Sequence, residues 1–207
     1  MKTRYISWDE ALGYKKDELE YAAGVLREGG LVAFPTETVY GLGGNGLMKE
    51  ASVKIYEAKG RPSDNPLILH ISSRQELEPI VRGITPEAEA LMEAFWPGPM
   101  TLIFQKAPEV PLETTGGLET VAVRMPSHAG ARELIRQAGV PVAAPSANTS
   151  GRPSPTRAEH VKEDLDGKID VIIDGGQVGI GIESTIIDLT EDVPVILRPG
   201  YITKAMA

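Results

Sequence analysis

The sequence predicts an α/β domain with a twisted mixed sheet and flanking helices. Its 207 residues, 42% of them hydrophobic, are enough to bury one large core, since domains average roughly 150 residues. Short apolar runs typical of buried strands alternate with helical stripes along the whole chain. No repeat, low-complexity linker or composition shift marks a boundary. We therefore predict a single domain over residues 1–207.

Composition excludes several classes of function. The chain has no cysteine, which excludes disulfides, thiolate nucleophiles and cysteine-ligated zinc. Its net charge of −8 disfavours broad nucleic-acid binding, which usually needs a basic face. No apolar run approaches the ~20 residues of a membrane span, and the first residues lack the apolar segment of a secretory signal. We expect a soluble, cytoplasmic protein that binds no membrane.

The stretch from residue 31 to residue 70 organises the chain. A buried strand at residues 31–34 stops at a proline, and Thr36 and Thr38 then place hydroxyls beyond its end. A glycine-rich segment, a helix and the cationic loop of Lys59 and Arg61 follow. In open α/β sheets, ligands bind beyond the carboxyl ends of strands. We therefore expect the functional site to begin here.

Apolar residues at helical spacing predict five helices. The third has the clearest boundaries, because Thr85 is a suitable N-cap, Pro86 suits the first helical position, and the prolines of residues 97–99 stop the helix. Thr156 and Glu159 have the spacing of a capping box before the fifth. The predicted helices span residues 17–28, 48–56, 85–95, 131–138 and 156–165.

Apolar runs without helical period predict the strands. In residues 120–125, the alternation of a strand places Thr120 and Arg124 on one face and Val121 and Val123 on the core face. The predicted strands span residues 31–34, 67–71, 101–104, 120–125, 140–144, 170–174, 184–189 and 195–197.

Polar side chains gather at the ends of these strands. Several strand ends that converge on one concave cleft would explain this distribution. The residues concerned are Thr36, Thr38, His70, Arg124, Ser146, Asn148, Ser184, Thr185 and Arg198.

Some motifs point away from common chemistries. Gly41, Gly43 and Gly46 fit G-x-G-x-x-G but begin too far beyond the strand for a dinucleotide site, so we expect them to allow tight turns and close backbone approach. The three histidines have no metal-ligand spacing, and we assign no metal site. No G-x-S-x-G elbow is present, so a serine hydrolase has little support.

Simpler interpretations of the candidate residues remain open at this point. On composition alone, residues such as Lys59 and Arg61 are more often found at a solvated helix end, although the neighbouring Gly60 and Pro62 favour a functional role. Residues 145–151 (PSANTSG) are equally explained as a turn-rich loop. Arg124 would be equally explained by an ion pair with an acidic neighbour at a strand end.

Six motifs in order carry a family resemblance: FPTETVYGLG, KGRPSDNPL, WPGPMTLI, VAVRMPSH, PSANTSG and ILRPG. Together, from about residue 24 to residue 200, they resemble the YrdC/TsaC family of threonylcarbamoyl-AMP synthases. The resemblance implies a YrdC-like fold with a concave ligand cleft. It also implies a reaction that joins L-threonine, bicarbonate or CO₂, and ATP into threonylcarbamoyl-AMP and pyrophosphate. Longer members add a second domain after the LRPG motif, so the chain resembles the single-domain form or the catalytic half of a longer one.

The resemblance also implies roles for individual residues. It assigns Lys59 and Arg61 to catalysis on the phosphates, and ATP arrives with Mg²⁺. Downstream proteins transfer the product to adenosine 37 of tRNA, and the acidic charge predicts weak or no direct tRNA binding by this chain. The ATP contacts implied or favoured by side-chain chemistry are Arg61, Asn65, Thr120, Ala144, Ser146, Asn148, Ser154 and Arg198, and the threonine contacts are Thr38, His70, Arg124 and Ser184.

Two rival functions use the same features. A double-stranded-RNA binding module would use the cleft without catalysis, and the acidic charge disfavours it. A related enzyme acting on a carbamoyl phosphate or an acyl adenylate would use the scaffold on another substrate. The intact PTETVYG, KGR and SAN motifs disfavour the second rival by family analogy.

Overall fold

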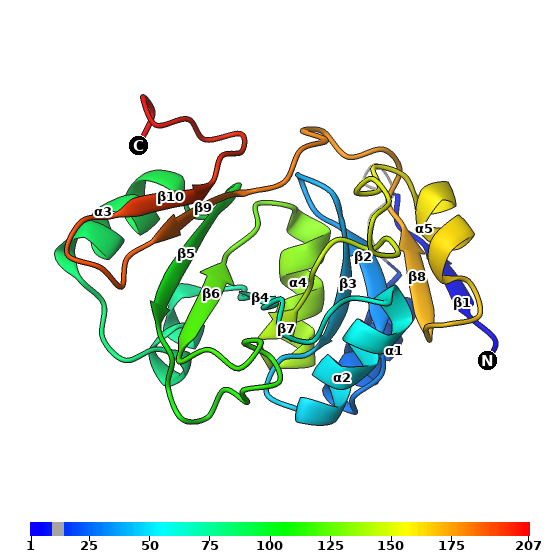
Figure 1. The fold of residues 1–207 in the computed structure, drawn as a ribbon. Helices are drawn as coiled ribbons and strands as arrows, with labels where there is room; N and C mark the ends of the chain where they lie inside the picture. Colours follow the sequence, from blue (N-terminus) through cyan, green and yellow to red (C-terminus); the bar gives the residue numbers. More distant parts are fainter. Residues whose placement is uncertain (10–14) are drawn as a thin grey trace.

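The computed structural model describes residues 1–9 and 15–207, and these form one sheet of ten strands with helices on both faces (Figure 1). The sheet order is β1-β8-β2-β3-β7-β4-β6-β5-β9-β10, with parallel and antiparallel pairs, which confirms a mixed α/β sheet. The strands are β1 (Arg4–Ser7), β2 (Val32–Pro35), β3 (Tyr40–Asn45), β4 (Ile68–His70), β5 (Met100–Gln105), β6 (Thr120–Arg124), β7 (Val142–Ala143), β8 (Val171–Asp174), β9 (Thr185–Asp188) and β10 (Val195–Arg198).

The helices lie where apolar periodicity predicts them. Thr85 caps its helix as predicted, since its side chain accepts a hydrogen bond from the main-chain nitrogen of Ala88 at 3.2 Å. The helices are α1 (Lys16–Arg27), α2 (Lys49–Lys59), α3 (Pro86–Phe95), α4 (Ala129–Ala138) and α5 (Ala158–Leu165), with 3₁₀ turns η1 (Arg74–Glu76) and η2 (Glu78–Ile80). No helix within the described ranges is long and apolar enough to cross a bilayer.

The glycine-rich segment is a buried strand, β3, where the sequence predicts a loop with tight turns. It pairs antiparallel with β2, and every residue in it is buried. The expectation of close approach is confirmed, because a Cβ on Gly43 would lie 2.7 Å from the ring of Phe34 and 2.9 Å from Val142. Its glycines lack side chains that would show a strand period, and for that reason the sequence pattern misses this strand.

One further strand was missed, and two further expectations are wrong. The strand β1 was not predicted, and only Val142–Ala143 of the strand expected over residues 140–144 is extended. The capping box of Thr156 and Glu159 does not form, because the N-cap of α5 is Arg157 and makes no side-chain capping bond. Local capping patterns leave the position of a helix end uncertain by one or two residues.

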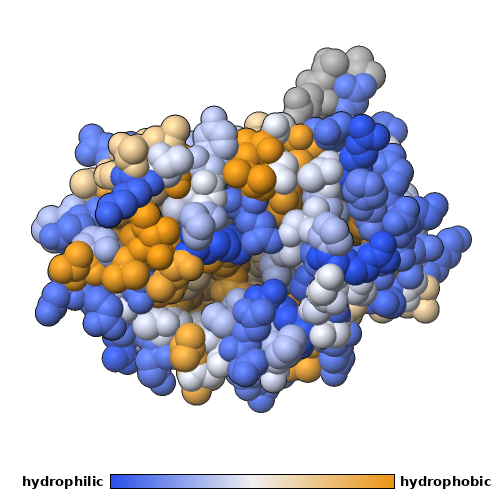
Figure 2. All heavy atoms as spheres, turned by 45° about the horizontal axis from the view of Figure 1, so that its top comes forward, coloured by the Kyte–Doolittle hydropathy of each residue, from blue (hydrophilic) through white to orange (hydrophobic). Residues whose placement is uncertain are grey.

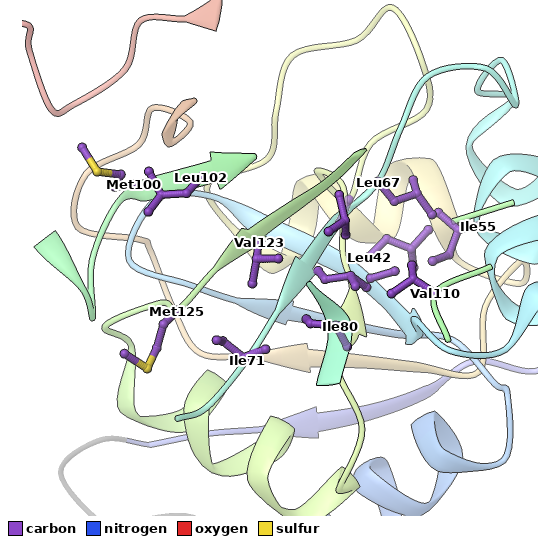
Figure 3. Packing of buried hydrophobic residues seen from close by; sticks show 14 of the residues in the cluster. Leu42, Ile55, Leu67, Ile71, Ile80, Met100, Leu102, Val110, Val123 and Met125 are labelled. Atoms are coloured by element: carbon purple, nitrogen blue, oxygen red, sulfur yellow. The ribbon is translucent and has the colours of Figure 1, made fainter. Parts of the chain in front are cut away.

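Two apolar layers cover the sheet. On one face, α1 and α4 pack together against β1, β2 and β8. The larger layer on the other face includes Leu42, Ile55, Leu67 and Val110, which lie close together between the sheet and α2 (Figure 3). Burial of such side chains, worth roughly 1.5–3 kcal/mol each, is the main stabilising contribution.

The same alternation that builds the core also builds the site. Val121 and Val123 of β6 lie in the core as predicted, while Ala122 and Arg124 face a cavity on the opposite side. One strand thus fixes both a hydrophobic anchor and a functional side chain.

Candidate active site

Strand ends converge on a cavity of about 440 Å³. Figure 2 shows a hollow near the centre of the molecular face, with hydrophilic side chains bordering it. The predicted convergence is confirmed for most of the strand-end residues. The walls are formed by Thr36, Thr38, Val39, Gly41, Arg61, Asn65, Pro66, Ile68, His70, Ile103, Ala122, Arg124, Ala144, Pro145, Ser146, Glu183, Ser184, Ile186, Leu197 and Arg198.

Arg124 is held by three partners on one wall. Its Nε donates to the main-chain oxygen of Gly98 at 3.2 Å, its Nη1 donates to Thr38 Oγ1 at 3.0 Å, and its Nη2 forms an ion pair with Glu37. The ion pair with an acidic neighbour, which the sequence leaves open, is therefore present. A guanidinium has five N–H donors and these contacts use three, so two remain for a ligand.

Glu37 links Arg124 to the start of α4. Its Oε2 accepts hydrogen bonds from the Ser127 main-chain nitrogen at 2.7 Å and the Ser127 hydroxyl at 2.6 Å. Burial alone would raise the pKa of Glu37, but the charge of Arg124 and the bonds from Ser127 outweigh burial and lower it. Glu37 is therefore an anion at neutral pH and orients the guanidinium.

His70 is a neutral imidazole beside this pair. Burial, with repulsion from Arg124, lowers the pKa of His70 to about 3. Its Nδ1 lies 3.1 Å from the main-chain oxygen of Ile68, a distance that suits a hydrogen bond donated by an Nδ1–H group.

Lys59 is buried, so the solvated-helix-end interpretation is wrong for it. Its side chain is only 2% exposed, and Nζ donates to the main-chain oxygens of Ser146 and Asn148, the latter at 2.5 Å. Burial, with repulsion from Arg61, lowers the pKa of Lys59 to about 8. In return, the Ser150 nitrogen donates to the Lys59 main-chain oxygen at 2.8 Å. Lys59 thus joins the end of α2 to the loop that follows β7.

Arg61 reaches the cavity wall because α2 ends at Gly60. Gly60 is left-handed, with φ of 61°, which favours glycine and turns the chain away from the helix axis. Arg61 then donates to the main-chain oxygens of Asn65 at 3.2 Å and Pro66 at 2.9 Å. Its guanidinium lines the cavity, and no carboxylate within the described part of the chain forms an ion pair with it or with Lys59.

Arg198 and Ser184 form a second charged wall. Arg198 Nε donates to the Ser184 main-chain oxygen at 3.0 Å, and Nη2 donates to the Ser184 hydroxyl at 3.1 Å. That hydroxyl also lies 2.8 Å from Thr101 Oγ1. Burial lowers the pKa of Arg61 and of Arg198, and the charge of Arg198 adds to the lowering at Arg61, so the two guanidinium groups are close enough to repel each other.

Not every predicted site residue lies on the wall. Lys59 lies beneath it, Ser154 donates to Glu183 Oε1 at 2.6 Å, and the Asn148 amide donates to main-chain oxygens of Thr149 and Arg152. Thr120 is half-buried and does not line the cavity. Thr185, grouped with these strand-end residues from the sequence, instead donates to the Ile202 main-chain oxygen at 2.7 Å.

Sequence reasoning assigned no role to two carboxylates of the site. Glu37 and Glu183 both pair with arginines of the cavity, across sequence separations of 87 and 15 residues. The one sequence signal is their position next to hydroxyl residues that were predicted to line the site. Glu37 lies between Thr36 and Thr38, and Glu183 directly precedes Ser184.

Both carboxylates already pair with an arginine, so they are poorly suited to bind a metal ion directly. No group of three or more His, Cys, Asp or Glu side chains within residues 1–9 and 15–207 has the arrangement of a metal site. The donors that face the cavity are mainly cations and hydroxyls, which fit anionic ligands.

Comparison with known proteins connects this geometry to a family. The profile of the Sua5/YciO/YrdC family, described as "Telomere recombination", matches residues 24–200. A protein of Pyrococcus abyssi called threonylcarbamoyl-AMP synthase is 61% identical over 88% of this chain and 54% of its own length. A protein of the same name from Bacillus subtilis is 54% identical over 99% of this chain and 60% of its own length. The chain therefore spans little more than half the length of these relatives.

A solved structure gives the same fold. The structure of Pyrococcus abyssi Sua5 complexed with L-threonine matches with a TM-score of 0.93 and 57% identity, over 96% of this chain and 58% of that one.

Proposed function

The chain belongs to the Sua5/YciO/YrdC family, and from this premise we propose that it is a threonylcarbamoyl-AMP synthase. It joins L-threonine, bicarbonate or CO₂, and ATP, and it forms threonylcarbamoyl-AMP and pyrophosphate. The observation that carries the proposal is a small cavity lined by three arginines, Arg61, Arg124 and Arg198, together with hydroxyl side chains. Such a cavity suits one amino acid beside one nucleotide.

The amino-acid side of the cavity is the wall of Arg124. We propose that its two remaining N–H donors bind the threonine carboxylate as a fork, since Glu37 and Thr38 hold the guanidinium in place. His70, neutral at pH 7, and the hydroxyl of Ser184 would contact the rest of the amino acid. The relative from Pyrococcus abyssi that was solved with L-threonine supports this assignment.

The nucleotide side is proposed to lie between Arg61 and Arg198. Arg61 is fixed by two main-chain oxygens and forms no ion pair with a described carboxylate, so its charge remains available to a phosphate. Charge-assisted hydrogen bonds of this kind contribute roughly 1.5–3 kcal/mol each. Asn65, Ala144 and Ser146 line the same region and would contact the remainder of the nucleotide.

The four residues off the wall have other proposed roles. Lys59 and Asn148 shape the loop whose Ser146 faces the cavity, and Ser154 acts through Glu183. Thr120 lies outside the cavity lining, so we propose that its contact to nucleotide is peripheral.

The chemistry needs positioning and charge rather than a covalent protein intermediate. The threonine nitrogen adds to the carbon of CO₂ and loses a proton to give a carbamate; from bicarbonate, the same carbamate forms with loss of a water molecule. A carbamate oxygen then bonds to the α-phosphorus while the bond from that phosphorus to the bridging oxygen breaks and pyrophosphate leaves. Two anions approach each other in this step, and Arg61 with Lys59 nearby offsets their repulsion.

We propose that magnesium enters with the triphosphate. Glu37 and Glu183, the carboxylates of the cavity, already accept hydrogen bonds from arginines, whereas Mg²⁺ commonly binds through substrate phosphates and water. The residues present therefore fit a metal that the nucleotide carries.

The proposed partners follow from the product. Proteins that transfer the threonylcarbamoyl group to tRNA would consume it in the cytoplasm. Direct tRNA binding by this chain should be weak, because 21 basic residues against 29 acidic ones release few counterions. Tight tRNA binding in a gel shift at physiological salt would favour the double-stranded-RNA rival instead.

Binding experiments test the two halves of the site separately. Titration calorimetry should detect L-threonine and a non-hydrolysable ATP analogue binding to the protein, each at one site. Binding of the nucleotide with no response to threonine, alone or with the analogue present, would point to the rival enzyme that acts on another acyl group.

A further inference from the structure

Glu183 holds the Ser154 hydroxyl and the Arg198 guanidinium together. Its Oε1 accepts from Ser154 at 2.6 Å, and its Oε2 pairs with Arg198 Nη1 at 2.5 Å. The carboxylate lines the cavity and is about a third exposed, at 35%, so it faces the space where ligand binds. The proposed function gives Glu183 no role beyond its hydrogen bond with Ser154.

The partners of Glu183 are groups that a phosphate would also use. A hydroxyl donor and a guanidinium are typical phosphate ligands, and a carboxylate matches the same donors with a similar geometry. The negative charge of Glu183 also opposes the lowering of the pKa at Lys59 and at Arg61, so it is electrostatically coupled to the other cations of this region.

We propose that Glu183 is an internal competitor for the nucleotide phosphates and so weakens the binding of ATP and of the pyrophosphate product. This inference rests on the proposed function. When a phosphate approaches Arg198, it must share or displace the carboxylate, and the like charges of the two anions repel. Tight binding of pyrophosphate to Arg61 and Arg198 would slow product release, and Glu183 counteracts this.

A purely structural role for Glu183 would predict the opposite change in anion affinity. If Glu183 only orients Arg198, its removal leaves the guanidinium mobile, and anions bind more weakly. A gain in affinity therefore separates competition from a structural role.

The test is titration calorimetry of inorganic pyrophosphate and of magnesium ATP into the wild type and Glu183→Gln. The amide keeps the size of the side chain and removes its charge. We expect Glu183→Gln to bind pyrophosphate roughly two- to fivefold more tightly, with a smaller gain at high salt. In steady-state turnover, pyrophosphate should inhibit the variant at correspondingly lower concentration.

Glu133→Gln is the matched control, since Glu133 also pairs with an arginine, Arg136, but on the exposed side of α4. It should leave both affinities unchanged. Glu183→Ala repeats the test without the amide, and thermal unfolding establishes that each variant is folded. Unchanged or weaker pyrophosphate binding in folded Glu183→Gln and Glu183→Ala would overturn the inference while leaving the synthase proposal intact. If the wild type and these variants all bind neither ligand, both the inference and the proposed function are wrong.

Discussion

The ammonium group of Lys59 and the main-chain oxygen of Asn148 lie 2.5 Å apart, although 89 residues separate them in the chain. The same ammonium group donates to Ser146, whose loop lines the cavity. Because Lys59 is buried, its ammonium group contacts the loop and not solvent, and it therefore positions the loop.

Lys59→Met should lower turnover by roughly tenfold or more while the protein stays folded. Methionine fills a similar volume but leaves two main-chain oxygens without their donor, so the loop of Ser146 loses its position. Steady-state pyrophosphate release and thermal melting measure the two effects. Lys54→Met is the matched control, because Lys54 also lies on α2 and donates to a main-chain oxygen, that of Gly29, outside the cavity. Equal turnover in the two variants would contradict the account.

Arg61→Ala should weaken binding of an ATP analogue by roughly tenfold or more, since it removes a charge-assisted contact of ~1.4 kcal/mol or greater. Threonine affinity should change much less, because the proposed contact to the threonine carboxylate is made by Arg124. Arg74→Ala removes an arginine from a surface ion pair with Glu89 and serves as control. Calorimetry that shows the same nucleotide affinity in Arg61→Ala and wild type would place Arg61 outside the nucleotide site.

Arg124→Lys should raise the apparent KM for threonine by roughly tenfold or more, with a smaller change for ATP. Lysine keeps the charge but loses the fork, and it cannot keep the contacts to Gly98, Thr38 and Glu37 at once. Arg136→Lys on the exposed side of α4 is the control. An equal loss for both substrates would remove Arg124 from the amino-acid site and leave the Glu37 pair as its only role.

His70 should make the protein sensitive to mild acid. Its folded-state pKa of about 3 lies below the ordinary value near 6.5, so between these two values the unfolded chain binds a proton that the folded protein does not. Stability is therefore lost as pH falls below about 6.5, by roughly 1.4 kcal/mol per pH unit at most.

Urea unfolding at pH 7 and pH 5 tests this. The free energy of unfolding of His70→Asn should fall less between the two pH values than that of the wild type, by roughly 2 kcal/mol. His160→Asn, on the exposed side of α5, should behave as the wild type does. A wild-type loss no larger than that of His70→Asn would show that His70 is protonated in the folded protein.

The sequence predicts the parts of the fold that have a periodic apolar pattern. The alternation in β6 correctly separates Val123 from Arg124, and the cap at Thr85 forms as expected. The strand β3 is not predicted because its glycines have no side chains to show the alternation of a strand. Phe34 and Val142 from neighbouring strands fill the space beside these glycines.

The candidate site divides in the same way. Hydroxyls and arginines at strand ends are visible in the sequence, and most of them line the cavity. Pairings between residues that are distant in the chain are not visible in the sequence. The partner of Arg124, for example, is fixed by how β6 and the segment after β2 meet in space. The sequence also leaves a solvated helix end open for Lys59 for the same reason, since the burial of Lys59 depends on a loop 87 residues away.

Pyrophosphate release tests the central claim most directly. ATP, L-threonine and bicarbonate are supplied together, singly and in pairs, with magnesium present throughout. The proposed threonine contacts centre on Arg124 and the proposed nucleotide contacts on Arg61 and Arg198, so rapid release is expected only when all three substrates are present. Release at the same rate without threonine would contradict the synthase function proposed for this chain.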